Sequence, residues 1–342
     1  MDKLKVGVIG LGKQSQGDHI PAVVDSGSST LVAVCDLEET LVNEFSAKYN
    51  VNGYLSFQDM FDKEKLDFVI VAVPHNAYHP IIEAAAKHKV HVIKEKPFAM
   101  NLEEAKHFTA LAKEHGIHIM TTVQRHFNPI YVTFFQLIDK IGRPSFFEGR
   151  YTIFTDCPHT GWRGSKISAG GGCLIDMGYH IIDLIVWYFG LPELVFAEMS
   201  STAKEDVSYD AEDTALLMIK YNHKKNFWGS VFVSRVTPPK TEYLRIVGTK
   251  GILELQRGSI ERYSCDGKLL EKLSRENSWP SAFTDQIEYF VHIIKGERED
   301  ISFPEFHLPH MAIIAAAYES NTSGNYVDPH KYLLGYEEIT KK

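Results

Sequence analysis

The sequence Lys5-Val6-Gly7-Val8-Ile9-Gly10-Leu11-Gly12-Lys13-Gln14-Ser15, near the N-terminus, decides the fold of this chain. Its first five residues are typical of a short buried strand, and the next six follow the pattern GxGxxG with serine in the third glycine position. In such a turn the first glycine allows a tight bend. The second lets the backbone approach a pyrophosphate held at the N-terminus of the next helix. We therefore expect a dinucleotide to contact Gly10, Gly12, Lys13 and Gln14.

A second strand, expected over residues 30–35, ends in Asp36. A carboxylate at this place can accept hydrogen bonds from the adenosine ribose hydroxyls, and it can also cap the following helix. The next residues, Leu37-Glu38-Glu39, include no arginine or lysine, and two more carboxylates would repel a 2′-phosphate. The sequence therefore favours NAD over NADP.

Apolar runs typical of covered parallel strands alternate with helical patterns up to residue 123. We expect further strands at 66–73, 90–93 and 117–123, and helices at 80–89 and 102–115. Strands that alternate with helices predict a doubly wound Rossmann-type α/β domain over residues 1–123.

After Arg125 the pattern changes to long strand-like runs with fewer helices. Strands are expected at 145–155, 194–202, 213–221, 226–236, 242–248 and 252–256, with hairpin turns at 222–225 and 249–251. Helices are expected at 130–141, 176–189, 279–294 and 309–321. This pattern predicts an α+β domain over residues 124–342 with a large, mostly antiparallel sheet, and its last helix can pack back on the N-terminal domain. One broad face of the sheet needs a cover of helices or another subunit, so we expect a homodimer or homotetramer through this sheet.

Composition excludes several classes of partner. A net charge of -8 and a pI near 6.1 argue against nucleic acid or an anionic membrane as a partner. No run approaches the roughly 20 apolar residues of a transmembrane helix, and the first strand begins too early for a signal peptide. The cysteines at 35, 157, 173 and 265 show no paired spacing. They indicate a reducing, cytoplasmic location, with no disulfide framework and no metal site.

Three side chains are candidates for catalysis. Lys96, in Glu95-Lys96-Pro97, follows a strand and is expected at the carboxyl edge of the sheet, where doubly wound folds bind ligands. Asp176 and His180 are four residues apart, so a helix would place both on one face. Oxidation of a secondary alcohol needs a base for the hydroxyl proton, and an imidazole suits that role near neutral pH. A carboxylate can orient the base or the substrate, and a lysine can polarise the developing alkoxide. Taken singly, each of these residues is more often structural than catalytic.

Other residues are candidates for binding. Trp162-Arg163 could pack near the nicotinamide and the phosphates, and Gly170-Gly171-Gly172 could let the backbone approach a ligand. A polyol could bind to hydroxyl-recognising side chains at Asp156, His159, Arg163 and Tyr179. A carboxylate or phosphate on the substrate could instead bind to Arg125 and Lys166.

The chain resembles the glucose–fructose oxidoreductase/inositol dehydrogenase (Gfo/Idh/MocA) family over nearly its whole length. The resemblance is carried by Gly10-Leu11-Gly12, Asp36, Glu95-Lys96-Pro97, Gln124-Arg125, Trp162-Arg163, Gly171-Gly172, Asp176, Gly178, His180 and Asp183. It implies an NAD(P)-dependent oxidoreductase that acts on sugars, cyclitols or their derivatives without a catalytic metal. It also implies that the catalytic group is Lys96, Asp176 and His180, with His180 as proton acceptor.

The resemblance further implies a cofactor lining that includes Pro74, His75, His79, Glu95 and Lys96. Gln124 and Arg125 are expected at the nicotinamide end, and the substrate is expected to contact Lys96, Arg125, His159, Asp176, Tyr179 and His180. Two features depart from the family pattern: Ser15 replaces the third glycine, and His19 lies one residue farther from the turn.

Two alternative functions remain open. Some relatives use tightly held NAD for redox-assisted glycoside cleavage, but they typically lack the lysine that stands here as Lys96. The fold can also become an NAD(H)-sensing regulator without catalysis. Such a protein has no need for Lys96, Asp176 and His180 together.

Overall fold

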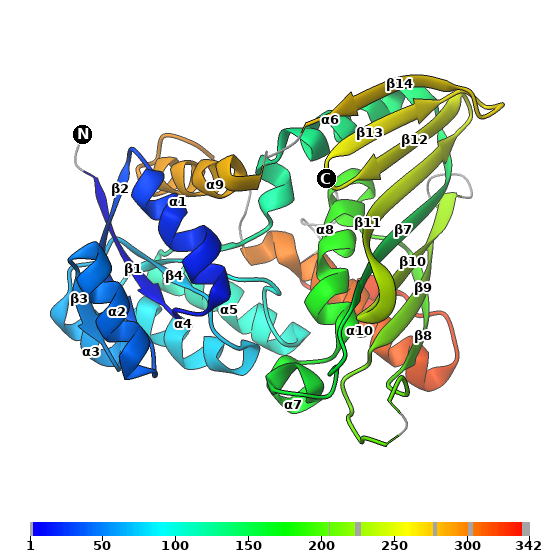
Figure 1. Ribbon diagram of the computed structural model, residues 1–342. Coiled ribbons are helices and arrows are strands. Elements are labelled where there is room, and N and C mark those ends of the chain that lie inside the picture. The colour runs from blue at the N-terminus through cyan, green and yellow to red at the C-terminus, as the bar shows by residue number, and fades with distance from the viewer. Residues whose placement is uncertain (1–2, 205, 223–226, 276–278, 300–303, 337–342) are drawn as a thin grey trace. The chain divides into compact units, whose positions relative to one another are not determined.

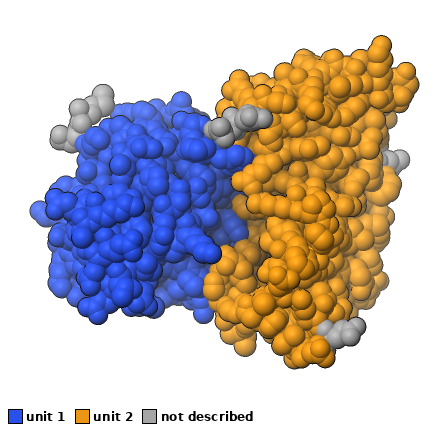
Figure 2. Space-filling view, viewed as in Figure 1, with its two compact units in different colours: residues 1–99, 103–127, 279–307 blue, residues 100–102, 128–278, 308–342 orange. Residues whose placement is uncertain are grey.

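The computed structural model describes residues 3–204, 206–222, 227–275, 279–299 and 304–336. It divides into two compact units (Figure 2). Unit 1 comprises residues 1–99, 103–127 and 279–307, and unit 2 comprises residues 100–102, 128–278 and 308–342.

Unit 1 contains a parallel sheet with the strand order β3-β2-β1-β4-β5-β6 (Figure 1). The strands are β1 (Leu4–Ile9), β2 (Ser29–Cys35), β3 (Asn52–Tyr54), β4 (Phe68–Val71), β5 (His91–Lys94) and β6 (Ile119–Thr121). This is the Rossmann order, and the predicted α/β fold is confirmed. The strand order reverses between β1 and β4, so the crevice at their carboxyl ends is the expected ligand site.

The helices of unit 1 are α1 (Ile20–Asp25), α2 (Glu39–Tyr49), α3 (Phe57–Lys63), α4 (Tyr78–Lys87), α5 (Leu102–His115) and α9 (Trp279–Ile294). A π-helical turn, Ser15–His19, precedes α1. A π turn takes one more residue than an α turn, so it absorbs the extra residue that separates His19 from the glycine turn.

Helix α9 is the main difference from the predicted domain boundaries. It lies far along the chain, yet it belongs to unit 1, whereas the last helix, α10 (Leu308–Ser323), belongs to unit 2. The reason is an apolar face on α9: Ile287 and Phe290 are buried in one cluster with Val6, Ile20 and Phe68. A helix that covers β1 and β4 in this way completes the core of the Rossmann sheet.

Unit 2 contains an eight-stranded sheet with the order β14-β13-β12-β11-β7-β10-β9-β8 (Figure 1). Its strands are β7 (Pro144–Phe154), β8 (Leu194–Ser200), β9 (Thr214–Tyr221), β10 (Phe227–Ser234), β11 (Val236–Gly248), β12 (Gly251–Gln256), β13 (Ser259–Tyr263) and β14 (Leu269–Ser274). Strands β7 and β10 pair in parallel, and the other recorded pairings are antiparallel, which confirms the predicted sheet. The turn after β11 is also confirmed, but the other predicted hairpin turn falls largely on residues 223–226, outside the described residues.

The remaining helices of unit 2 are α6 (Pro129–Leu137), α7 (Lys166–Ala169), α8 (Tyr179–Phe189) and α10. Helix α8 packs on the sheet, where a Cβ at Gly149 of β7 would lie 2.7 Å from the Ile181 side chain. A fully buried pair, His310 Nε2 to Asp183 Oδ1 at 3.1 Å, joins α10 to α8. In the described part of the chain, the stretch Lys166–Phe189 is long and apolar enough to span a membrane. However, 94% of its apolar window is buried inside the protein, as in a core helix.

Candidate functional site

The glycine turn after β1 is built for a close approach from outside. Gly10 has φ +89°, and a Cβ there would lie 2.4 Å from the carbonyl oxygen of Ala72, so only glycine fits. At Gly12, by contrast, a Cβ would meet no atom within 4 Å. The buried Ser15 hydroxyl donates a hydrogen bond to the Gly10 carbonyl at 2.5 Å. Serine therefore replaces the third glycine by tying the turn together.

Asp36 fixes the other side of this turn. Its carboxylate accepts hydrogen bonds from the backbone N–H groups of Leu11, at 2.6 Å, and Glu38, at 3.0 Å. A cavity of about 460 Å³ lies beside the turn at the ends of β1, β2 and β4. It is lined by residues that include Gly10, Gly12, Asp36, Leu37, Leu55, Pro74, Asn76 and Pro80. The position, the open space at Gly12 and the carboxylate fit the adenosine end of a dinucleotide.

Among the predicted cofactor residues that lie outside this cavity lining are Lys13, Gln14, His75 and His79. Lys13 and Gln14 are exposed on the turn, where Gln14 donates to Asp18 at 2.7 Å. His75 is buried and stacks on Tyr78, with ring centroids 5.9 Å apart. The ring of His79 pairs with Glu83 on its own helix, α4, and with Glu104 on α5.

Glu95 is held by the π-helical turn before α1. Its Oε1 lies 2.8 Å from His19 Nε2. Burial alone would raise the pKa of Glu95, but hydrogen bonds from His19 and Thr122 and the nearby charge of Lys96 hold that pKa below its ordinary value. The carboxylate therefore stays ionised and anchors the segment that carries Lys96.

Lys94 is a residue that the sequence analysis missed, although a lysine closing an apolar strand is itself a signal. Its side chain is fully buried, with Nζ 3.7 Å from the centroid of the Tyr78 ring. Nζ donates to the carbonyl oxygens of Glu95, at 2.8 Å, and of Pro97. Burial lowers the pKa of Lys94 to about 7, against the opposing charges of Glu104 and Glu95. Lys94 thus fixes the backbone on both sides of Lys96.

Lys96 itself is half-buried at the carboxyl end of β5, as predicted. Its backbone N–H donates to the Thr122 hydroxyl at 3.3 Å, and the Lys96-Pro97 peptide bond is cis. Gln124 and Arg125 are buried in a short helix, Gln124–Phe127, and the Arg125 guanidinium lies 5.7 Å from the Trp279 ring centroid. The strand end and this helix therefore hold three predicted site residues within unit 1.

Within unit 2, Asp176 pairs with Arg163. Asp176 lies in a π-helical turn, Leu174–Gly178, and its Oδ2 accepts a hydrogen bond from Arg163 Nε at 3.0 Å. The guanidinium also lies 4.2 Å from the centroid of the Trp162 ring. The predicted cofactor residues Trp162 and Arg163 thus form one group with a predicted catalytic carboxylate.

His180 follows directly in the first turn of α8. It is half-buried, with its ring 5.9 Å from that of Tyr151. Because Asp176 sits in a π turn and His180 in an α turn, the simple α-helical spacing expected between them does not apply.

Other parts of the protein fill the space beside the glycine run that precedes Asp176. A Cβ at Gly172 would lie 2.1 Å from the carbonyl oxygen of Glu212, and one at Gly171 would lie 1.9 Å from the Tyr318 hydroxyl. The Glu212 carboxylate accepts hydrogen bonds from Tyr318, at 2.9 Å, and from the Leu174 N–H, at 3.1 Å. The expectation that these glycines open the backbone to a ligand is therefore corrected, since the space they leave is filled by Glu212 and Tyr318.

Two predicted substrate residues have structural surroundings. Tyr179 is fully buried and stacks on His310, with centroids 5.4 Å apart, which argues against a substrate contact. His159 is half-buried, and its ring lies 6.2 Å from that of Tyr209. Arg235, which the sequence analysis did not single out, donates to the carbonyls of Arg163, at 2.8 Å, and Ala211, at 2.9 Å. It fixes the loop that carries Arg163.

Two family models match this chain. Residues 4–123 match the model described as "Oxidoreductase family, NAD-binding Rossmann fold", and residues 132–254 match the "GFO/IDH/MocA C-terminal domain". The chain belongs to the Gfo/Idh/MocA family. The predicted family is thus confirmed, and the glycine turn, Asp36 and Lys96 lie in the part that matches the NAD-binding model.

Relatives of this Gfo/Idh/MocA chain are distant. It is 25% identical to D-apiose dehydrogenase of Rhizobium rhizogenes, over 96% of this chain and 98% of that protein. It is 26% identical to the uncharacterized oxidoreductase YdgJ of Escherichia coli, where the match spans 56% of this chain and only 55% of the relative. A solved oxidoreductase of Desulfitobacterium hafniense, described as NADPH-dependent, shares the fold with a TM-score of 0.86 at 20% identity, over 97% of this chain and 99% of that one.

Proposed function

We propose that this Gfo/Idh/MocA protein transfers hydride between the nicotinamide of NAD and a secondary alcohol or ketone carbon of a sugar, a cyclitol or a derivative of either. The observation that carries the proposal is the open backbone at Gly12 beside the Asp36 carboxylate, both lining one cavity at the switch point of the sheet. When bound there, NAD supplies the hydride acceptor. Membership in an oxidoreductase family supports the same reaction class.

NAD is the preferred cofactor in this proposal. The cavity rim carries Asp36 and the highly exposed Leu37, and Glu38 and Glu39 follow them at the surface. Ribose hydroxyls can donate hydrogen bonds to the lone pairs that remain on Asp36. A 2′-phosphate would instead be repelled by the three carboxylates of Asp36, Glu38 and Glu39. Replacement of Asp36 by alanine is therefore expected to weaken NADH binding and to narrow its advantage over NADPH.

The proposed chemistry divides between three side chains. His180 would accept the hydroxyl proton of the substrate as the carbinol becomes a carbonyl group, and bound NAD would take up the hydride. Lys96 donates a hydrogen bond to the oxygen that carries the developing charge. Asp176, held by Arg163 at 3.0 Å, positions the substrate hydroxyl or the imidazole. In the reverse direction His180 returns the proton and the ketone is reduced.

The substrate class follows from the family and from the polar candidates. The related D-apiose dehydrogenase is named for a sugar. Exposed polar residues of unit 2, Asp156, Arg163 and Lys166, suit a polyhydroxylated ligand. The free cysteines recorded for the described chain fit a reducing cytoplasm.

We also propose a homo-oligomer through the sheet of unit 2. One face of β9 and β10 presents apolar side chains to solvent: Leu216 and Trp228 are 45% and 46% exposed, and Phe232 pairs with Leu216 across the strands. A second copy of this face would bury them. Light scattering of the Trp228→Glu variant tests this, since an unchanged mass would contradict the proposed interface.

The decisive experiment is an NADH-absorbance screen of the purified protein against inositols, aldoses, sugar phosphates and nucleotide sugars, with NAD and NADP in parallel. Lys96→Met and His180→Asn should each lower turnover by about 10²–10⁴-fold, the contribution typical of general acid–base catalysis. Their Kd for NADH should stay within about twofold, because neither residue lines the cavity. Normal turnover in His180→Asn would refute its role as base.

Two other outcomes would favour the alternatives. Release of a sugar from a glycoside without net NADH change would indicate redox-assisted hydrolysis. Tight NADH binding without turnover of any compound, equal in wild type and Lys96→Met, would indicate a sensor.

A further inference from the structure

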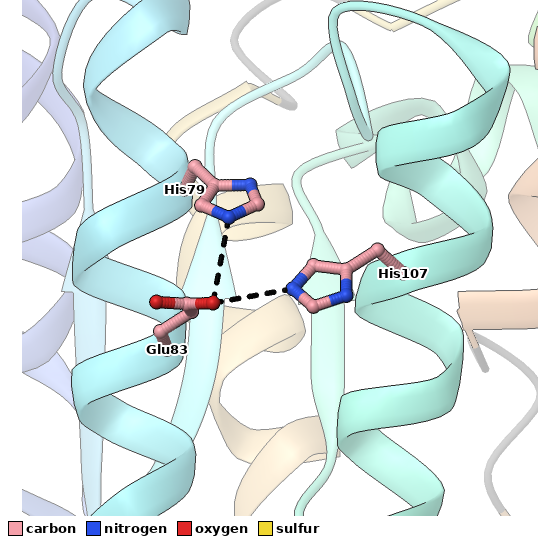
Figure 3. Close-up of side chains that lie close together, drawn as sticks. All are labelled: His79, Glu83 and His107. Atoms are coloured by element: carbon pink, nitrogen blue, oxygen red, sulfur yellow. Dashed lines mark ion pairs between the residues drawn. The ribbon is translucent and has the colours of Figure 1, made fainter.

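Two neighbouring helices of unit 1 bring two histidines and a glutamate together, outside the proposed hydride chemistry (Figure 3). His79 and Glu83 are one turn apart on α4, and His107 lies opposite them on α5. We propose that His79, Glu83 and His107 form a binding site for a divalent transition metal ion, with zinc as the best fit. The spacing of the cysteines predicted no metal site, and His79 was expected to line the cofactor.

The distances suit tetrahedral zinc. Zinc bonds of 2.0–2.1 Å place neighbouring ligand atoms about 3.4 Å apart. Glu83 Oε1 lies 3.5 Å from His79 Nε2 and 3.4 Å from His107 Nε2. The three ligand atoms all lie within 4.8 Å of one another. The two rings are stacked nearly parallel, at 11° with centroids 4.9 Å apart, so the rings would have to turn about χ2 for both lone pairs to point at one ion.

A carboxylate behind His79 supports the site. His79 Nδ1, the nitrogen away from Glu83, lies 3.6 Å from Glu104 Oε1 on α5. Histidines that bind metals commonly donate their second ring N–H to a carboxylate, which fixes the tautomer and orients the ring. At 3.6 Å this contact is longer than a hydrogen bond, and a slight closure would let Nδ1 donate to Glu104 and leave Nε2 as the lone-pair atom that faces Glu83.

The surroundings of these three side chains are better explained by a bound metal ion than by separate ion pairs at the surface. His107 Nε2 is buried and has no hydrogen-bond partner among the described residues, so its only recorded neighbour of opposite charge at this nitrogen is Glu83. The side chains of His79, Glu83 and His107 are 46%, 36% and 40% exposed, so an ion can enter from solvent. Three protein ligands and one water would complete the coordination and join α4 to α5.

The test uses the full-length, untagged protein after dialysis against a chelator. Zinc is titrated in competition with a chromophoric chelator, and bound metal is counted by elemental analysis. We expect one high-affinity zinc ion per chain, and a Tm that rises by several degrees with saturating zinc. Substitution of cobalt should give the visible bands of a four-coordinate ion.

Variants separate this site from scattered histidines, of which the chain has 16. His107→Gln and Glu83→Gln should each lower zinc affinity at least tenfold, and Glu104→Gln should lower it about 10–100-fold. The matched control is His88→Gln, since His88 also pairs with a surface carboxylate, Asp62 Oδ1 at 3.5 Å, but has no third ligand atom recorded nearby. Its zinc affinity should equal that of the wild type.

Circular dichroism and NADH binding confirm that each variant is folded. Equal zinc affinity in wild type and His107→Gln, or a loss as large in His88→Gln, would overturn the proposal. Absence of a stoichiometric zinc ion in the wild-type protein would overturn it as well. None of these results depends on turnover, so they are independent of the proposed oxidoreductase activity.

Discussion

Two glycine-rich segments of this chain look alike in sequence and differ in what occupies the space beside them. At Gly12, in the turn after β1, a Cβ would meet nothing within 4 Å. At Gly172, before Asp176, a Cβ would collide with the backbone of Glu212, at 2.1 Å from its oxygen and 2.3 Å from its nitrogen. One glycine leaves room for a ligand, and the other leaves room for the protein. A glycine run therefore indicates a close approach, and only the structure shows what approaches.

Two lysines that are two positions apart, Lys94 and Lys96, show the same kind of contrast. Lys94 is fully buried, and its ammonium group donates hydrogen bonds to the carbonyl oxygens of Glu95 and Pro97. Lys96 is half-buried at the strand end, where the proposed substrate binds. The first lysine holds the backbone in place for the second.

The largest effect is expected for Gly172→Ala. The new methyl group would push against backbone atoms of Glu212, which cannot rotate away, so the free energy of unfolding should fall by about 3 kcal/mol, the upper end of the usual cost of overpacking. Chemical denaturation followed by circular dichroism measures this loss. NADH affinity of the folded fraction should stay unchanged, because the cavity lies in unit 1. A stable Gly172→Ala protein with weakened NADH binding would mean that Gly172, and not only Gly12, leaves room for the ligand.

The second prediction concerns the pH dependence contributed by Lys94. The unfolded chain keeps this proton up to the ordinary lysine pKa of 10.5, whereas the folded protein releases it near pH 7. The unfolded state therefore binds more protons between these values, and stability rises with pH across this window. Lys94 should add about 2 kcal/mol of stability between pH 7 and pH 9, at 1.36 kcal/mol per pH unit.

Lys94→Met removes this proton uptake. Its free energy of unfolding, measured by urea denaturation at several pH values, should lack the rise that the wild type shows. The control is Lys87→Met on the exposed end of α4, which changes the net charge equally and should keep the wild-type slope. Parallel pH profiles for wild type and Lys94→Met would show that Lys94 keeps its proton when buried.

Local patterns were enough to predict most of the fold. The apolar runs of β1, β4 and β5 and the alternation along β7 to β12 identified both sheets, because burial on two faces or one dictates these patterns. Strands β13 and β14 were missed because Ser259–Tyr263 and Leu269–Ser274 are rich in charged residues. The position of α9 in unit 1 was also missed, since nothing local tells which sheet its apolar face covers.

The features of the candidate site that depend on local sequence could be predicted. The contacts that join segments distant in the sequence could not. The turn at Gly10, the place of Asp36 at the end of β2 and the strand end at Lys96 follow from chain order within one α/β unit. The pairing of Arg163 with Asp176, the support from Arg235 and the meeting of His79 with His107 join separate segments. No spacing in the sequence encodes these contacts.

The smallest expected effect is also the sharpest test of the open glycine. Gly12→Ala adds a methyl group where no protein atom lies within 4 Å, and Gly12 is absent from the positive-φ residues of the described chain. The free energy of unfolding should therefore stay within about 0.5 kcal/mol of the wild type. The methyl group would occupy the path of the pyrophosphate, so the Kd for NADH should rise about tenfold, which corresponds to about 1.4 kcal/mol. Fluorescence titration with NADH measures this, with Gly17→Ala as the control, because Gly17 is equally open but lies beyond the turn. Unchanged NADH affinity in Gly12→Ala would mean that the space beside this glycine serves no ligand.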